Sequence, residues 1–392
     1  MIEQLTWDHV LLVAGWLIAG MWLATVLPSF RHSLGQRPLG AGPLELREDD
    51  AWPEVTVVAP ARNEASAVRA ALRSLLDLDY PSLRIVAVDD RSTDATGAIM
   101  DELATSHPRL AVIHVSQLPP GWLGKNHANW IGAAQSQSPW ILFTDADVLF
   151  RPDALKHAIH IAQQRQLDHL ALYPGRICGG FWEDLMVLTF ALVLTLRYKP
   201  WRACTPDRRY FMGIGAFNLV SRKAYETIGT HRRLAMEVAD DVKLGKLIKQ
   251  HGLRQDVLMG SLLIQVRWQL GLRGVVRGLT KNAFAAFDYS LARTLGASAG
   301  FLLMFLLPYL LAVLAPGYAR LGFLAALCVL HATFFTMVRA SHANLLLPCL
   351  LPVSLSVFLF AVWRSALITL RQGGVQWRDT FYPLDELRKG LV

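Results

Sequence analysis

The apolar residues of this chain are concentrated in four runs, and these runs limit the folds that are open to it. They cover residues 9–28, 298–316, 321–338 and 344–363. A helix of about 20 apolar residues is long enough to cross the hydrocarbon layer of a membrane. The first run follows an acidic segment, MIEQLTWD, whereas a cleavable signal peptide begins with a basic one. We therefore expect a transmembrane helix within residues 1–30, further transmembrane helices within 297–370, and a tail at 371–392.

The charged residues beside the first run predict its orientation. Glu3 and Asp8 precede the run, and Arg31, His32 and Arg37 follow it. Because basic residues favour the cytoplasmic side of a span, we expect an external N-terminus and a cytoplasmic central domain in a multi-pass protein of the cell (inner) membrane. The net charge of +8 fits a surface beside anionic lipid better than it fits nucleic-acid binding.

The end of the sequence conflicts with this orientation. Four complete spans would place both ends of the chain outside. The chain from residue 364 onward nevertheless carries basic residues, which prefer the cytoplasm: Arg364, Arg371, Arg378, Arg388 and Lys389. Either one apolar run does not cross the membrane, or the charge rule fails here.

The region between the runs alternates strands with helices. Short apolar runs predict strands at 54–60, 84–90, 109–115 and 140–144, and helical spacing predicts helices at 65–77, 93–105 and 126–136. The order β-α-β-α-β-α-β is typical of a parallel sheet covered on both faces. We therefore expect an α/β domain over residues 50–260.

Polar residues follow three of these strands, where ligands bind in such sheets. They are Ala61-Arg62-Asn63-Glu64, Asp89 to Asp94, and Asp145-Ala146-Asp147. Three polar loops at one edge of a sheet indicate a single site. The sequence has neither GxGxxG nor GxxxxGK[ST] at these turns, which excludes the usual dinucleotide and P-loop signatures.

Each loop predicts a part of that site. Asp145 and Asp147 end a strand with one residue between them, so their carboxylates face the same way and suit Mg²⁺ or Mn²⁺ bound together with a diphosphate. Asp89 and Asp90 either hydrogen-bond a uracil ring and a ribose or cap the next helix. Lys125 follows a Pro/Gly turn and either contacts the diphosphate or lies on a plain surface loop.

Asp240 and Asp241 form a second acidic pair, in a segment that is expected to be helical. Adjacent carboxylates repel each other, which raises one pKa and suits a general base near neutral pH. The alternative is a solvated helix start. Just upstream, residues 213–218 contain two glycines, where a sugar could approach the backbone closely.

Two further segments are expected to lie at the membrane surface. Arg273, Arg277 and Lys281 form one basic face of an amphipathic helix within residues 261–296, which either lies in the membrane interface or is an ordinary amphipathic helix of the domain. Residues 181–198 are apolar but short for a span, which favours a re-entrant or interfacial helix.

With these motifs identified, the chain resembles family 2 glycosyltransferases of the GT-A fold over roughly residues 54–290. The motifs are VVAPARNE, VDDRSTDAT, GWLGKNHA, TDAD and VADDVKLG, in that order. The flanking apolar runs and the closing VQWRDTFYP are similar to the membrane-bound branch associated with hopanoid and carotenoid biosynthesis, and distantly to ceramide glucosyltransferases. The resemblance implies a Rossmann-like mixed sheet with flanking transmembrane helices.

The resemblance also implies an inverting transfer from a nucleotide sugar, usually UDP-linked, to a membrane lipid such as a hopanoid, carotenoid or sphingolipid-like hydroxyl. Asp241 matches the base of the family's acidic pair, with Asp240 where Glu is more usual. The family's QxxRW motif is one residue shorter here, so Arg267 and Trp268 remain as acceptor-site candidates while Gln265 does not align. The expected nucleotide-sugar site comprises Pro60, Ala61, Asn63, Glu64, Asp89, Asp90, Lys125 and Asp145.

Two other functions compete with this one. A polyprenyl-phosphate sugar synthase would use a phosphate acceptor, which needs little help from a base. A non-catalytic membrane protein that binds sugar nucleotides belongs to a different class, and the intact acidic motifs argue against it. A pure transporter is disfavoured because the expected spans contain no acidic residue.

Overall fold

The computed structural model describes residues 7–34, 38–44, 52–377 and 379–392. Three residues of the charge argument, Glu3, Arg37 and Arg378, lie outside the described residues, as does the expected domain boundary at residue 50. The chain forms two units. The sheet unit consists of Arg37–Ile177, Tyr198–Arg267 and Asp385–Val392, and the helical unit consists of Met1–Gln36, Cys178–Arg197 and Trp268–Leu384.

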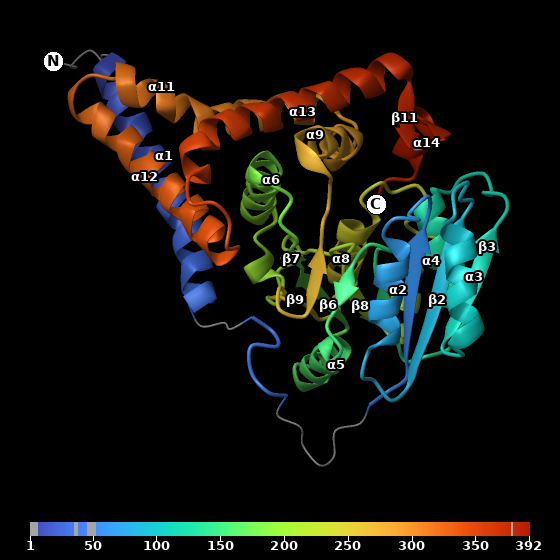
Figure 1. Cartoon of the computed structure of the whole chain (residues 1–392). Coiled ribbons are helices and arrows are strands. Elements are labelled where there is room, and N and C mark those ends of the chain that lie inside the picture. The colour runs from blue at the N-terminus through green and yellow to red at the C-terminus, as the bar shows by residue number, and fades with distance from the viewer. Residues whose placement is uncertain (1–6, 35–37, 45–51, 378) are drawn as a thin grey trace. The chain divides into compact units, whose positions relative to one another are not determined.

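A seven-stranded mixed sheet forms the centre of the sheet unit (Figure 1), with the order β3-β2-β1-β4-β8-β6-β9. The first four are parallel, β8 is antiparallel to both β4 and β6, and β6 is parallel to β9. The strands are β1 (Val55–Ala61), β2 (Leu83–Asp90), β3 (Leu110–Val115), β4 (Trp140–Phe143), β6 (His169–Tyr173), β8 (Asn218–Ser221) and β9 (Gln255–Met259).

Helices cover both faces of this sheet because its central strands are apolar on both sides. In β1, Val57 faces one core and Val58 faces the other, as strand alternation requires. The first core includes α2 (Val68–Leu76), α3 (Thr96–Ser106) and α5 (Ala154–Gln164). The second includes α4 (Gly124–Ala134), α7 (Arg222–Thr227) and α8 (Asp240–Gln250).

Smaller elements complete the sheet unit. A three-stranded sheet pairs β5 (Leu149–Phe150), β10 (Ile264–Val266) and β7 (Gly175–Arg176). A 3₁₀ turn covers Pro200–Arg202, and α14 (Leu384–Lys389) begins at the boundary with the helical unit.

The four predicted strands are confirmed within two residues of their expected ends. The four strands are parallel as expected, and the antiparallel β8 makes the sheet mixed, as the resemblance to the GT-A fold implies. The helix expected from residue 93 begins instead at Thr96. The reason is a turn before it, in which Asp94 Oδ1 accepts a hydrogen bond from the Thr96 amide at 2.9 Å.

The helical unit contains most of the apolar sequence. Four of its helical segments, among the described residues, are long and apolar enough to cross a membrane: Trp7–Arg31, Leu291–Leu314, Gly317–Ala340 and Leu347–Gln372. The helices are α1 (Trp7–Leu34), α6 (Phe181–Tyr198), α9 (Gly271–Asn282), α10 (Leu291–Phe301), α11 (Leu307–Leu314), α12 (Gly317–Ala340) and α13 (Leu351–Gln372). A π-helical stretch at Leu302–Leu306 joins α10 to α11, 3₁₀ turns cover Ala285–Phe287 and Leu347–Leu350, and β11 (Gly374–Trp377) pairs with β12 (Thr380–Pro383).

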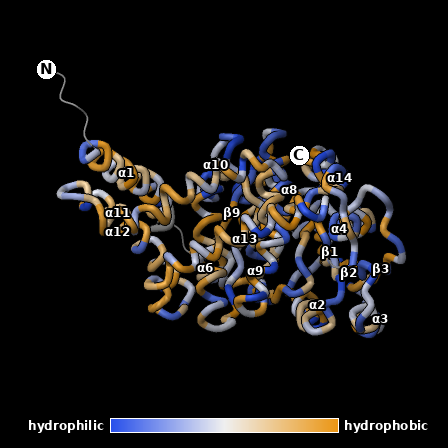
Figure 2. The backbone as a smooth tube through the Cα atoms, turned by 90° about the horizontal axis from the view of Figure 1, so that it is seen from above, coloured by the Kyte–Doolittle hydropathy of each residue, from blue (hydrophilic) through white to orange (hydrophobic). Residues whose placement is uncertain are grey.

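Helices α1 and α12 lie side by side in the helical unit (Figure 1). Their closest approach is at two glycines: a Cβ on Gly322 would lie 2.7 Å from the carbonyl carbon of Gly15. Small residues at the crossing point are typical of helix pairs inside membranes, because they let the backbones pack closely. The tube of Figure 2 is mainly hydrophobic in colour along α11 and α12.

Candidate functional site

The first acidic pair follows β4, as the sequence predicts. The Asp145 amide donates to the carbonyl oxygen of Gly215 at 3.1 Å, which fixes the backbone. The Asp145 carboxylate lies 2.6 Å from Lys125 Nζ. Lys125 is the second residue of α4, so the start of that helix and the end of β4 are joined by an ion pair.

Asp147 lies in a region with an excess of negative charge. Burial, together with the nearby charges of Asp145 and Glu64, raises the pKa of Asp147 to about 7, although Lys125 opposes the shift. A divalent cation would relieve this excess, so the two carboxylates fit a metal. Among the described residues, no group of three or more His, Cys, Asp or Glu side chains could hold a metal ion alone. Further ligands would therefore have to come from a bound molecule such as a diphosphate.

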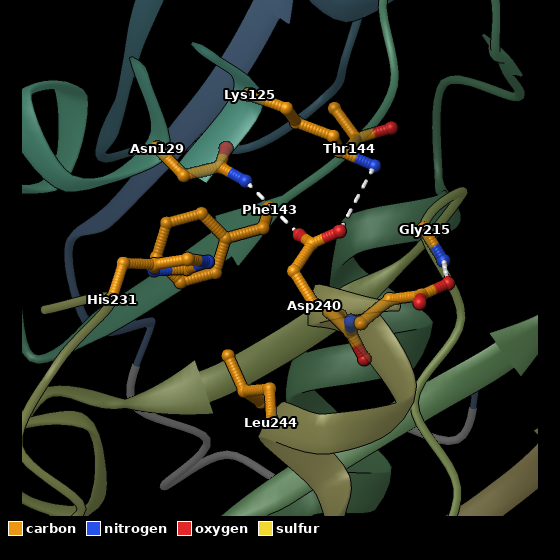
Figure 3. A pocket seen from close by; sticks show the side chains of 10 residues that line it. Lys125, Asn129, Phe143, Thr144, Gly215, His231, Asp240 and Leu244 are labelled. Carbon is orange, nitrogen blue, oxygen red and sulfur yellow. Dashed lines mark hydrogen bonds and ion pairs between the residues drawn. The ribbon is translucent and has the colours of Figure 1, made fainter. Parts of the chain in front are cut away.

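The second acidic pair begins α8 and lies opposite Lys125 (Figure 3). Asp240 is 3.8 Å from Lys125 Nζ and accepts a 3.5 Å hydrogen bond from Asn129 Nδ2. Asp241 accepts hydrogen bonds of 2.8 Å from the amides of Gly215 and Val242. One residue, Gly215, therefore bonds to both acidic pairs: its carbonyl to Asp145 and its amide to Asp241.

The two glycines upstream of this pair let both acidic motifs pack closely against their backbone. A Cβ on Gly213 would lie 1.8 Å from the Asp241 carbonyl oxygen, and one on Gly215 would lie 2.7 Å from Asp145 Oδ2. The space beside the glycines is thus filled by the acidic motifs themselves. The approach of a sugar to this backbone stays a prediction, and Gly215 lines the pocket beside the second acidic pair.

The charges of this cluster depend strongly on each other. Burial raises the pKa of Asp240 to about 7; Lys125 acts against this shift, while Asp241 and Asp145 act with it. Burial also raises the pKa of Asp241, although Lys125 and the two backbone amides that donate to Asp241 oppose this shift. Burial alone would lower the pKa of Lys125, but the charges of Asp145, Asp240 and Asp241 outweigh it and raise that pKa.

The loops after β1 and β2 are tied to one another. Asn63 has a positive φ of 53°. Its side-chain oxygen Oδ1 accepts a 2.8 Å hydrogen bond from the Thr93 amide, and its backbone amide donates to Ser92 Oγ at 3.0 Å. The Glu64 amide donates to Thr96 Oγ1 at 2.8 Å. Pro60 and Ala61 end β1, where Ala61 is in register with Asp89 of β2. The predicted loop residues therefore meet at one edge of the sheet.

Asp89 and Asp90 have different surroundings. Asp89 accepts hydrogen bonds from the Ser92 amide and pairs with His114 Nδ1, both at 3.0 Å, so it stabilises the loop. Asp90 pairs with the Arg91 guanidinium at 2.8 Å. It also lies against the start of α4, because a Cβ on Gly124 would be 2.1 Å from Asp90 Oδ2. Asp90 is thus the member of the pair that lies next to the Lys125 segment.

Arg267 and Trp268 fall on either side of the boundary between the two units. Within the helical unit, Trp268 stacks on Phe190 of α6, with ring centroids 4.6 Å apart and planes 7° from parallel. It also contacts a small core formed by Met186, Val275, Leu279 and Ala361.

Sequence reasoning missed several residues of the pocket around the second acidic pair. Asn129, Thr144 and His231 line it together with Lys125, Asp240 and Asp241 (Figure 3). Asn129 is buried, and its Oδ1 has no hydrogen-bond partner in the described part of the chain. Asn129 lies four residues after Lys125, one helical turn along α4, and that spacing was the only sequence signal for it.

Comparisons with known proteins agree with this geometry. Residues 56–229 match the family model described as Glycosyl transferase family 2. The 4,4'-diaponeurosporenoate glycosyltransferases of Staphylococcus aureus strains USA300 and MRSA252 are each 24% identical over 342 residues, which covers 85% of this chain and 89% of theirs. A mannosyltransferase from Pyrobaculum calidifontis, solved with GDP-Man and Mn²⁺, aligns with a TM-score of 0.53 at 18% identity, covering 92% of this chain and 98% of that one. The fold is therefore GT-A.

Proposed function

Because this chain is a glycosyltransferase that carries a family 2 domain, we propose that it transfers a sugar from a nucleoside diphosphate sugar, UDP-linked, to an acceptor group on a membrane lipid. The observation that carries the proposal is the placement of Lys125 between Asp145 at 2.6 Å and Asp240 at 3.8 Å. The Lys125 ammonium group thereby lies between two carboxylate pairs. The first pair is suited to binding a metal ion and a diphosphate, and the second is suited to acting as a general base.

The donor would bind at the edge of the sheet where the loops after β1, β2 and β4 meet. Asp90 is assigned to binding the nucleobase of the donor, and Asp89 is assigned to stabilising the loop that carries Asp90. The backbone of Pro60 and Ala61, with Asn63 and Glu64, would form the wall beside the nucleoside. Lys125 is assigned to the diphosphate, as a point charge that is released from Asp145 when the diphosphate binds.

A divalent cation, Mg²⁺ or Mn²⁺, is expected on Asp145 and Asp147. The raised pKa of Asp147 supports this assignment, because it reflects a carboxylate with too little positive charge nearby. Such a cation would neutralise the charge that develops on the leaving diphosphate. The Pyrobaculum mannosyltransferase, which shares the fold, was solved with Mn²⁺ and GDP-Man.

Asp241 is assigned as the general base and Asp240 as its partner. A base must be partly deprotonated near neutral pH and still be able to take a proton. Burial beside a second carboxylate raises the pKa of both residues, which meets that requirement. Direct attack of the activated acceptor on the anomeric carbon would invert its configuration. Asp241 accepts hydrogen bonds from the Gly215 and Val242 amides, so its geometry is fixed before the acceptor arrives.

The acceptor is proposed to come from the lipid bilayer, with Arg267 and Trp268 near its binding site. The four apolar helices support a multi-pass membrane location, and the basic residues after the first apolar run support a cytoplasmic sheet unit. The Staphylococcus relatives are named for diaponeurosporenoate, a carboxylate. A carboxylate is already ionised at neutral pH and needs no base, whereas a hydroxyl does. The acidic pair therefore favours a hydroxyl as the acceptor group of the lipid. The name of the relatives makes a carboxylate the second candidate for that group.

A product analysis tests this proposal. Purified protein would be incubated with Mg²⁺ or Mn²⁺, a panel of nucleotide sugars and lipid extract, and the lipids analysed by mass spectrometry. We expect one lipid species to gain the mass of one sugar, with loss of the reaction on metal chelation. Alkaline hydrolysis then separates the two acceptors, because a glycosyl ester is cleaved and a glycoside is not. Transfer only to water or to a soluble acceptor would contradict a lipid acceptor.

A further inference from the structure

Residues 385–392 belong to the sheet unit although the apolar helices separate them from it in sequence. The Val392 amide donates to Glu237 Oε1 at 2.5 Å, and the Val392 carbonyl oxygen accepts from Lys243 Nζ at 2.9 Å and Lys246 Nζ at 2.6 Å. A Cβ on Gly390 would lie 2.3 Å from Met236 Cβ. The segment is therefore packed and hydrogen-bonded onto the residues just before α8 and onto α8 itself.

This packing limits how the chain can cross a membrane. The sheet unit includes Arg267 and also Asp385, so both positions must lie on the same side of the bilayer. The chain between them must then cross an even number of times. Three candidate spans lie in that interval, within Leu291–Leu314, Gly317–Ala340 and Leu347–Gln372. At least one of the three therefore does not cross.

Two of the three have the properties of true spans. Helix α12 packs along α1 through Gly322 and Gly15, as membrane helix pairs do. In the most apolar 18-residue window of Leu291–Leu314 only 11% of the residues are buried within the structure, against 39% for the corresponding window of Leu347–Gln372. It therefore presents the largest surface that needs lipid.

Helix α13 has an exposed stripe that suits the membrane surface better than the membrane interior. Val353, Phe360 and Leu367 are 48%, 59% and 50% exposed, and their seven-residue spacing puts them on one face. Arg364 and Arg371 are exposed on that same face. In a helix that crosses the bilayer over Leu347–Gln372, Arg364 would lie within the hydrocarbon layer, at a cost of up to about 3 kcal/mol. In a helix lying at the surface, its guanidinium reaches the headgroups.

The partner of α13 within the helical unit supports the same placement. Arg364 Nη1 donates to Thr280 Oγ1 of α9 at 2.9 Å, and Ala361 packs in one core with Val275 and Leu279 of α9. Helix α9 is the amphipathic helix that exposes Arg273 and Arg277. Two helices with basic exposed residues that pack on each other form a surface suited to anionic headgroups.

We propose that α13 lies along the lipid headgroup layer on the same side of the membrane as the sheet unit, and that only α10–α11 and α12 cross between the two parts of that unit. The proposal rests on the membrane location in the proposed function, but not on the reaction. It also removes the conflict in the sequence, because the basic residues from Arg364 onward then share the side of the sheet unit.

Single-cysteine labelling tests this placement. The four native cysteines would be replaced, and single cysteines introduced by Lys223→Cys in the sheet unit, Tyr318→Cys at the start of α12, Leu345→Cys before α13, and Asp385→Cys. All four positions are exposed. A membrane-impermeant maleimide would be applied to right-side-out and inverted vesicles. We expect positions 223, 345 and 385 to label from one side and position 318 from the other.

The outcomes separate the alternatives. Labelling of position 345 from the side opposite position 223 would overturn the proposal, since α13 would then cross. Labelling of all four positions from one side would overturn both the proposal and the multi-pass location, while the product analysis above would still decide the reaction. Activity of each variant on its donor shows that the protein has folded.

The depth of α13 provides an independent measurement. A bimane label on Phe360→Cys in the middle of α13 would be compared with one on the native Cys328 in the middle of α12, which is also exposed. Lipids brominated near the headgroup or near the chain end would quench the two labels. We expect shallow quenching to exceed deep quenching at position 360 and the reverse at position 328. Deep quenching at both positions would overturn the proposal.

Discussion

The two acidic pairs of the sheet unit have the same composition but different surroundings. Asp145 and Asp147 follow a strand and are partly exposed, and Lys125 pairs with only one of them. Asp240 and Asp241 begin a helix, and they are held by Asn129, Lys125 and two backbone amides. An open pair that lacks positive charge suits a cation and a phosphate ligand. An enclosed pair with fixed donors suits proton transfer. Surroundings, rather than residue type, thus separate the two roles.

The largest effect that would test this comparison is expected at Asp241. Asp241→Asn keeps an oxygen for one backbone amide but removes the proton acceptor, so we expect kcat with a hydroxyl acceptor to fall about 10³-fold. Steady-state kinetics on the lipid acceptor measures this, with Asp240→Asn as the matched variant and circular dichroism as the check of folding. A kcat within a few-fold of the wild type would show that the acceptor is already ionised or that the base lies elsewhere.

A smaller loss is expected at Asp147. Asp147→Asn removes one of the two assigned metal ligands, and we expect kcat/KM to fall about 10²-fold, with weaker dependence on Mg²⁺ or Mn²⁺. Calorimetric titration of UDP with and without metal checks the binding step. Asp79→Asn is the control, because that carboxylate is 71% exposed and lies outside the site. Unchanged metal dependence in Asp147→Asn would remove the distinction between the two pairs.

The third prediction concerns the backbone that joins the pairs. Gly213→Ala would place a Cβ 1.8 Å from the Asp241 carbonyl oxygen, and we expect the free energy of unfolding to fall by about 1–3 kcal/mol. Denaturant titration in detergent measures it. Gly42→Ala is the matched control, since a Cβ there meets nothing within 4 Å. Equal stabilities for the two variants would show that the glycine is not needed for packing.

The smallest effect is a pH dependence. Because the pKa of Asp240 is raised to about 7, the pair gains its negative charge as the pH rises through 7, and kcat/KM should increase about twofold between pH 7 and pH 8. Lys125→Met should move this midpoint upward, since Lys125 lowers the pKa of Asp240. A midpoint near pH 4 in both proteins would contradict a raised pKa.

Stability should change in the opposite direction, and at lower pH. The folded state holds a proton on Asp240 up to about pH 7, whereas the unfolded state loses it near its ordinary pKa of 3.8. The free energy of unfolding contributed by this group therefore falls as the pH rises from about 4 to 7. Asp240→Asn should remove that part of the decline in thermal or denaturant unfolding.

The parts of the fold that could be predicted are those with local signals. Strands β1, β2 and β4 are short apolar runs because both their faces are largely buried, and each was found from its own residues. Strand β3, at the edge of the sheet, is partly exposed but was also found from its own apolar run. The antiparallel β8 could not be found in this way. It has four residues and exists because β4 and β6, distant in sequence, lie on either side of it.

The same division applies to the candidate site. Asp145, Lys125 and the Asp240–Asp241 pair were found because each is a charged residue in a motif. Gly215 was noticed, but its role of bonding to both pairs depends on a fold that brings residues 145 and 241 together. Asn129 was missed because an amide in a helix has no distinctive pattern, and only its burial with an unsatisfied oxygen marks it.

The packing of residues 385–392 onto the sheet unit also determines the order of assembly. Domains usually fold as they emerge from the ribosome, from the N-terminal end onward. Here the Glu237 side chain and the Lys243 and Lys246 ammonium groups acquire their bonds to Val392 only after residues 291–372 have been synthesised. With the proposed membrane insertion of residues 291–372, maturation of the sheet unit would follow that insertion, and a chain that stalls during insertion would lack these bonds.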